Sequence, residues 1–156
     1  MLEKSVSESL KSGIVKHGDN VVITAGVPVG VSGTTNLIKV HTIGKVLLKG
    51  MGIGRKSVSG KICIGSSKEE LENKFEEGDI LVSVFTDKDM VEYMKKASAI
   101  IVEQGGLTSH AAIVGLNFRK PTVVGAEGAT KLLQNGETVT IDTSAGLIYK
   151  GEARVL

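Results

Sequence analysis

Apolar residues recur at every fourth position at the start of this chain: Leu2, Val6, Leu10 and Ile14. With lysine and glutamate between them, this spacing predicts an amphipathic helix. Alternating apolar residues follow over residues 21–25 and 34–43, and each of these segments predicts a strand. One helix and two strands cannot enclose a core by themselves. We therefore expect residues 1–44 to be the terminal part of a domain that continues upstream.

From residue 60 onward, short strand and helix patterns alternate. Strands are predicted in "GKICIGS", "DILVSVF", "SAIIVEQ" and "KPTVVGA", and a helix pattern follows each of them. Ser67 and Glu70 have the spacing of a capping box at the start of the first of these helices. The last two strands, "ETVTIDT" and "GLIYKG", are joined too tightly for a parallel crossover and predict a hairpin. We therefore expect a compact α/β domain with a mixed sheet over residues 60–156.

Glycine and serine are concentrated between these two parts, in "KGMGIGRKSVSG" at residues 49–60. Such a composition is typical of a flexible connection. The predicted organisation is therefore a first domain over residues 1–44, a linker over residues 45–59 and a second domain over residues 60–156.

The amino-acid composition argues against several classes of binding partner. Aromatic residues make up only 3% of the chain and tryptophan is absent, so nucleic-acid bases would find few side chains on which to stack. A single cysteine, Cys63, excludes an internal disulfide. No apolar run at the N-terminus suits a signal peptide or a membrane span. We expect no nucleic-acid partner, no membrane partner and a cytoplasmic location.

The stretch "EQGGLTSHAAIVG", residues 103–115, places a glycine pair and a histidine at a predicted helix start. The candidate anion-binding residues are Gly105, Gly106, Thr108 and Ser109, with Thr108, Ser109 and His110 expected on the first helical turn. Glycines permit close approach of a ligand, and the N–H groups of a helix start attract phosphate. A neutral imidazole can attack phosphorus, so His110 is a candidate phosphoryl acceptor. A glycine pair followed by Thr or Ser is also an ordinary helix start, and both interpretations remain open.

A second stretch, "TAGVPVGVSGTTN" at residues 24–36, is rich in backbone and hydroxyl donors. It lacks the lysine of a phosphate-binding P-loop. It can wrap a phosphate or a sugar hydroxyl, but on physical grounds a long polar hairpin connection is favoured. Its candidate ligand-binding residues are Gly30, Ser32, Gly33, Thr34, Thr35 and Asn36. No residues at metal-ligand spacing accompany either stretch, so no metal site is predicted.

Longer segments resemble known families. "GDNVVITAGVPVGVSGTTNLIKVHTIG", residues 18–44, resembles the end of the C-terminal domain of bacterial pyruvate kinases. "EQGGLTSHAAIVG…KPTVVG…GETVTIDTSAGLIY" resembles the phosphohistidine, or swivelling, domain of PEP-utilising enzymes. Pyruvate kinases of Bacillus-like bacteria carry the two in this order, with the second as an extra C-terminal domain. The resemblance covers nearly the whole chain.

The resemblance implies a fold and a set of functions. The second domain would have the β/β/α swivelling fold, with His110 as the phosphoryl acceptor. Residues 26–36 would form half of an allosteric site for a sugar phosphate or nucleotide. The partners would be the remainder of the kinase chain and the other subunits of a tetramer. The catalytic barrel, and the Mg²⁺ and K⁺ that it uses, would lie outside this chain, which would hold no cofactor of its own.

Two positions depart from the resemblance. Leu116 stands where the swivelling domains usually have arginine, and Arg119 stands where they usually have the glycine that ends the helix. The first change removes a cation near the candidate phosphohistidine, and the second predicts a less regular helix end. We therefore expect residues 60–156 to be a structural or allosteric module that is inactive alone, the alternative being a phosphocarrier that forms phosphohistidine at His110.

Overall fold

A computed structural model describes residues 2–16, 19–26, 35–42 and 45–151. The described residues divide into two compact units, one within residues 2–45 and the other over residues 46–151. In the first unit, helix α1 (Leu2–Lys11) is followed by strands β1 (Asn20–Gly26) and β2 (Thr35–Thr42). The two strands pair antiparallel, with Val22 opposite Val40. The helix and both strands agree with the apolar patterns of the sequence.

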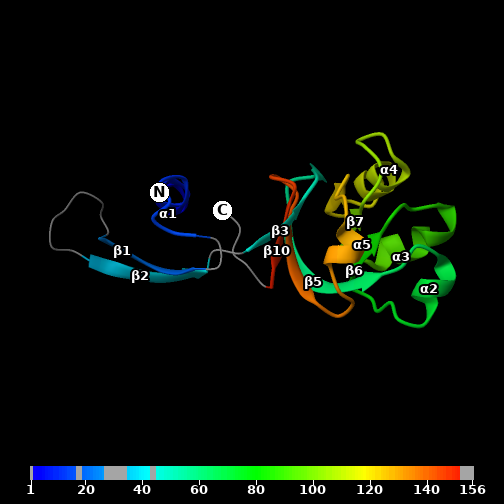
Figure 1. Cartoon of the computed structure of the whole chain (residues 1–156), viewed down its shortest axis with the longest axis horizontal. Coiled ribbons are helices and arrows are strands. Elements are labelled where there is room, and N and C mark those ends of the chain that lie inside the picture. The colour runs from blue at the N-terminus through cyan, green and yellow to red at the C-terminus, as the bar shows by residue number, and fades with distance from the viewer. Residues whose placement is uncertain (1, 17–18, 27–34, 43–44, 152–156) are drawn as a thin grey trace. The chain divides into compact units, whose positions relative to one another are not determined.

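The second unit is one sheet of eight strands with helices packed on it (Figure 1). In chain order its elements are β3 (Val46–Lys49), β4 (Met51–Ile53), β5 (Ser57–Ile64), α2 (Lys68–Glu72), β6 (Ile80–Ser83), the 3₁₀ helix η1 (Lys88–Met90), α3 (Val91–Lys96), β7 (Ala99–Val102), α4 (His110–Asn117), β8 (Thr122–Val124), α5 (Ala129–Leu132), β9 (Thr138–Asp142) and β10 (Leu147–Lys150). The strand order across the sheet is β3-β10-β9-β5-β6-β7-β8-β4.

The sheet is mixed, as the sequence predicts. Strands β5, β6, β7 and β8 pair parallel, whereas β9 pairs antiparallel with both β5 and β10. The parallel strands are connected through the helices α2, α3 and α4, which is the usual route for a parallel crossover. The hairpin of β9 and β10 confirms the tight connection around "SAG".

The central strands β6 and β7 are buried on both faces, and their alternate residues enter two separate cores. Ile80, Val82 and Ile101 belong to a core that includes residues of α5, β9 and β10. Leu81 and Ile100 belong to the other core, with residues of α2, α3 and α4. Because successive side chains of a strand point to opposite faces, these continuous apolar runs join the two cores.

Residues 45–59, which the sequence predicts to be a flexible linker, are part of the sheet. They contain β3, β4 and the start of β5, with β3 pairing with β10 and β4 pairing with β8. The glycines allow close packing rather than flexibility: a Cβ at Gly52 would lie 1.8 Å from the carbonyl oxygen of Thr143. Only glycine lets the backbones approach so closely.

Helix α4 packs on β8 through the same kind of contact. A Cβ at Gly115 would lie 2.1 Å from Oγ1 of Thr122 and 3.0 Å from its Cβ. Thr122 is fully buried and its hydroxyl donates to the carbonyl of Lys120, 3.0 Å away. The missing side chain at Gly115 therefore determines how close α4 lies to the sheet.

We predict that Gly115→Ala destabilises the chain, although alanine favours a helix by about 1 kcal/mol over glycine. Overpacking against Thr122 costs about 1–3 kcal/mol and should exceed that gain. Urea unfolding of the purified chain measures the net effect. Gly106→Ala is the control, because the nearest heavy atom to its added Cβ is Cε of Met51 at 3.9 Å.

A double-mutant cycle separates the clash from other effects of the substitution. Thr122→Ala removes Oγ1, the atom nearest to the new Cβ, and leaves only the Cβ of residue 122 at 3.0 Å, so Gly115→Ala should cost less in that background. Equal destabilisation in both backgrounds would contradict this account of the packing.

Candidate functional site

His110 is the first residue of α4, directly after the N-cap Ser109. Ser109 is extended (φ −70°, ψ 161°), and its hydroxyl oxygen accepts from the N–H of Ala112 at 3.4 Å. Thr108 therefore lies outside the helix, contrary to the prediction that it shares the first turn with Ser109 and His110. The physical reason is that the capping residue must leave the helical conformation to reach the amide.

The glycine pair before the helix forms a tight turn. Gly105 has φ +102°, a conformation that favours glycine, and a Cβ there would lie 2.7 Å from Cβ of Ser109. The N–H of Ser109 donates to the carbonyl of Gly106 at 3.0 Å. Within the described residues, the N–H groups of His110 and Ala111 donate to no protein acceptor. They are the donors that a small anion at this helix start would find.

A residue from another part of the chain orients the histidine. Oγ1 of Thr86 lies 2.9 Å from Nδ1 of His110. Thr86 is buried and follows β6, whereas the His110 side chain is exposed. Because Nδ1 is engaged, Nε2 is the ring nitrogen left to meet solvent or a ligand.

The sequence did not reveal this role for Thr86. The segment "TDKDMVEYMKKA", residues 86–97, predicts instead a helix that is opened by Thr86 or Asp87. Asp87 has that role, since its carboxylate accepts from the N–H of Asp89 at 3.0 Å and caps η1. No sequence signal pairs a threonine with a histidine 24 positions later.

The loop that leads to the glycine turn is held at its base by Glu103. Its carboxylate accepts from the backbone N–H of Thr130 at 2.7 Å and from the Thr130 hydroxyl. These two hydrogen bonds lower the pKa of Glu103 below its ordinary value. The N–H of Glu103 also donates to the carbonyl of Ser83 at 3.0 Å. Through these hydrogen bonds, Glu103 connects the ends of β6 and β7 with the start of α5.

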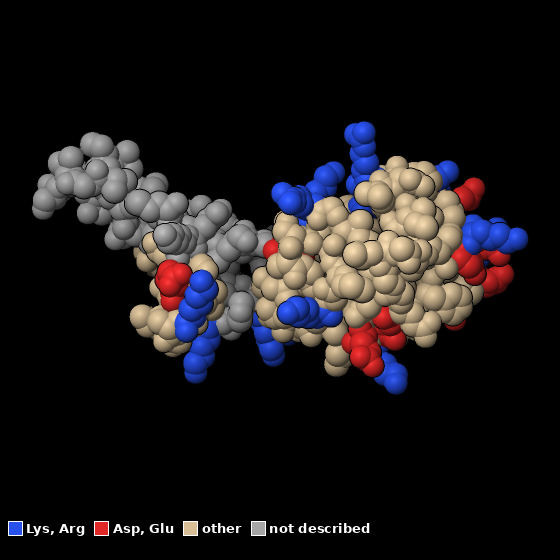
Figure 2. Space-filling view, turned by 90° about the horizontal axis from the view of Figure 1, so that it is seen from above, with Lys and Arg blue, Asp and Glu red and all other residues tan. Residues whose placement is uncertain are grey.

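Exposed apolar side chains lie on α4, in the loop before it and next to Thr86. Leu107 is 64% exposed, Ile113 51% and Leu116 65%, while Phe85, next to Thr86, is 49% exposed. Figure 2 views the second unit from the side that carries α4, and this face is mainly free of charged side chains, with lysines and arginines near its edges. We call Phe85, Leu107, Ile113 and Leu116 the apolar surface of α4.

The other end of α4 is more regular than the sequence predicts. Arg119 has φ +52° and donates from its N–H to the carbonyl of Leu116 at 3.1 Å. The N–H of Lys120 donates to the carbonyl of Gly115 at 2.8 Å. These are the two hydrogen bonds of a Schellman motif, formed here with arginine in the position that usually holds glycine.

The second candidate stretch lies largely outside the described residues. Thr35 and Asn36 begin strand β2, with Thr35 opposite Gly26. The remaining candidates of this stretch are not described: Gly30, Ser32, Gly33 and Thr34.

The described ranges contain no group of three or more His, Cys, Asp or Glu residues that could hold a metal ion. Among the same residues, no helix has the length and apolar character needed to cross a membrane.

We predict that Glu103→Gln lowers the free energy of unfolding at neutral pH. The variant should also lose less of this free energy than the unmodified chain as the pH falls. The folded pKa of Glu103 is lower than the unfolded value of about 4.3. Its stabilisation is therefore complete above the unfolded value and is lost as the pH falls through the folded pKa. Urea midpoints from pH 7 to pH 3 measure the effect. A constant difference between Glu103→Gln and the unmodified chain across this range would contradict the prediction, and Glu127→Gln serves as the control.

Comparisons with known proteins cover both units. Residues 1–41 match the family described as pyruvate kinase, alpha/beta domain, and residues 75–146 match PEP-utilising enzyme, mobile domain. The chain is 54% identical over all 156 residues to a pyruvate kinase of Geobacillus stearothermophilus and 53% identical to one of Bacillus licheniformis. It spans 27% and 26% of their lengths.

Solved structures agree on the fold. Aconitase X of Thermococcus kodakaraensis in its holo-form has a TM-score of 0.51 and 19% identity, over 67% of this chain and 98% of that one. At this identity the likeness concerns the fold alone. The sequence matches are specific to both units, and they agree with the segments on which the resemblance was based. The chain therefore resembles a part of the pyruvate kinases of Bacillus-type bacteria, in which an alpha/beta-domain segment is followed by the mobile domain of PEP-utilising enzymes.

Proposed function

We propose that this chain is a C-terminal, non-catalytic part of a pyruvate kinase, and that it stabilises the enzyme or regulates it. The relatives' name implies phosphoryl transfer from PEP to ADP, which yields pyruvate and ATP and requires Mg²⁺ and K⁺. The chain matches about a quarter of those relatives, and the chemistry is assigned to the part that it does not match. In this proposal the enzyme is a cytoplasmic tetramer, and residues 26–36 contribute to a site for a sugar phosphate or nucleotide effector.

The observation that carries this proposal is the apolar surface of α4. Three side chains on it are at least half exposed: Leu107, Ile113 and Leu116. Contiguous exposed apolar residues mark interaction surfaces in soluble proteins. The remainder of the kinase is the natural occupant, because the relatives contain about three times more chain than this match covers. Docking there would also cover His110.

The arrangement of the histidine supports a second candidate function, that of a phosphocarrier. In the tautomer whose Nδ1–H donates to Oγ1 of Thr86, Nε2 has a lone pair that could attack the phosphorus of PEP. The bond from phosphorus to the enol oxygen would break, and the enolate would take a proton to become pyruvate. Within the described residues, however, Thr86 is the one side chain that hydrogen-bonds to His110. Leu116 stands where the swivelling domains usually have an arginine, which could act as a charge clamp. This difference makes the non-catalytic role the preferred one.

Labelled PEP distinguishes the two functions. The chain is incubated with labelled PEP and Mg²⁺, and its intact mass is measured under alkaline conditions that preserve phosphohistidine. The preferred proposal predicts no phosphoryl gain. A gain that is lost in His110→Ala and retained in His41→Ala would overturn it and establish the phosphocarrier.

Substitutions on the apolar surface of α4 test the structural role in the complete enzyme. We expect Leu107→Lys and Ile113→Lys each to lower the stability of the full-length tetramer or its cooperativity, with kcat unchanged. Loss of one buried aliphatic contact corresponds to about 1.5–3 kcal/mol. Thermal unfolding and substrate saturation curves measure both effects.

Two controls accompany these variants. Glu69→Lys changes charge on α2 and should leave the enzyme unaffected. The isolated chain should tolerate Leu107→Lys and Ile113→Lys, because both side chains are exposed in it. Full-length enzymes indistinguishable from the parent would contradict the docking role.

A further inference from the structure

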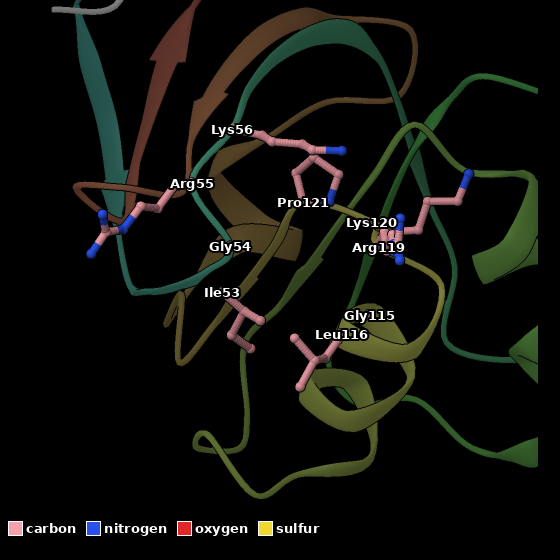
Figure 3. A pocket seen from close by; sticks show the side chains of 9 residues that line it. All are labelled: Ile53, Gly54, Arg55, Lys56, Gly115, Leu116, Arg119, Lys120 and Pro121. Carbon is pink, nitrogen blue, oxygen red and sulfur yellow. The ribbon is translucent and has the colours of Figure 1, made fainter.

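A cleft of about 320 Å³ lies at the opposite end of α4 from His110 (Figure 3). One wall is the turn after β4, residues 53–56, and the other is the end of α4 and the start of β8, residues 115–121. Its volume is at the lower end of the range for small-ligand sites. A ligand of roughly nucleotide size or smaller would fill it.

The charged residues around the cleft are all basic: Arg55, Lys56, Arg119 and Lys120. No aspartate or glutamate lines it, and within the described residues none of the four cations forms an ion pair. Figure 3 shows Lys56 beside Pro121, with Arg119 and Lys120 together on one side and Arg55 on the other. Like charges gathered without a counter-ion favour an anion between them.

The remaining wall is apolar. Ile53 and Leu116 extend toward one another in Figure 3, and the buried Pro121 also lines the cleft. Leu116 is 65% exposed, so a ligand could still cover much of its surface. An apolar wall beside basic groups suits a ligand that has both an anionic group and an apolar face.

Backbone hydrogen bonds hold both walls in place. The N–H of Lys56 donates to Oγ1 of Thr143 at 2.9 Å, and its carbonyl accepts from the N–H of Thr143 at 3.0 Å. The opposite wall is held by the Schellman motif at Arg119. Arginine there occupies a backbone conformation that favours glycine. An arginine in a backbone conformation that favours glycine suggests that its side chain has a function.

We infer that this cleft binds a small organic phosphate. Lys56, Arg119 and Lys120 would surround the phosphate, and Ile53 and Leu116 would contact the less polar part of the molecule. Lysine ammonium and arginine guanidinium groups are the usual phosphate partners in proteins. The cleft includes neither His110 nor any of residues 26–36, and it shares Leu116 with the apolar surface of α4.

The test titrates the complete 156-residue chain with AMP by calorimetry and by NMR. We expect a Kd of about 1 mM or tighter at low salt, with shifts at residues 53–56 and 115–121. Adenosine, which lacks the phosphate, and inorganic phosphate, which lacks the apolar part, should each bind about tenfold or more weakly. Added KCl should weaken AMP binding, because partly exposed charges are screened over about 10 Å at 0.1 M salt.

Two substitutions isolate the cations without disturbing the fold. Lys56→Gln leaves the backbone bonds to Thr143 in place, and Arg119→Gly fits the left-handed conformation at that position. Each should weaken AMP binding about tenfold, while unfolding shows Arg119→Gly at least as stable as the parent chain. Lys150→Gln, on β10, is the matched control and should bind AMP normally.

Several results would overturn the inference. They are AMP binding that Lys56→Gln and Arg119→Gly leave unchanged, adenosine binding as tightly as AMP, and no saturation by AMP at about 10 mM. A polyaspartate peptide that binds the cleft more tightly than AMP would also overturn it, since the occupant would then be an acidic protein segment.

Discussion

The close packing of α4 on β8 is the constraint on which the functional features depend. An isolated helix of eight residues is unstable in water, so α4 exists because its inner face packs on the sheet through Ala111, Ala112 and Gly115. That packing leaves His110 at one end and the cationic cleft at the other. The two ends of such a helix lie about 12 Å apart, so the sites can act independently.

Local signals predicted most of the elements. The apolar runs identified the strands of the second unit from β5 onward, and the hairpin of β9 and β10 followed from its short connection. The capping residue was correct: Ser67 accepts from the N–H of Glu70 at 3.3 Å, and the Glu70 carboxylate accepts from the N–H of Ser66. These features depend on residues a few positions apart, so the sequence contains them directly.

Long-range contacts could not be predicted in the same way. The glycines at 50 and 52 indicated a linker, but they permit contacts with β8 and with Thr143, more than 70 positions away. The pair of Thr86 and His110 and the gathering of Lys56 with Arg119 likewise depend on the tertiary fold. A glycine-rich composition indicates only that the backbone can adopt many conformations. These contacts depend on which distant segments the fold brings next to each residue.

The central claim is that the apolar surface of α4, with His110 on it, is covered in the complete enzyme. The most direct test is the rate at which diethyl pyrocarbonate modifies His110, followed by mass spectrometry in the isolated chain and in the full-length kinase. We expect rapid modification in the isolated chain, where His110 is exposed, and modification at least several-fold slower in the complete enzyme. Equal rates would show that the histidine stays accessible, which contradicts docking and favours a free phosphocarrier.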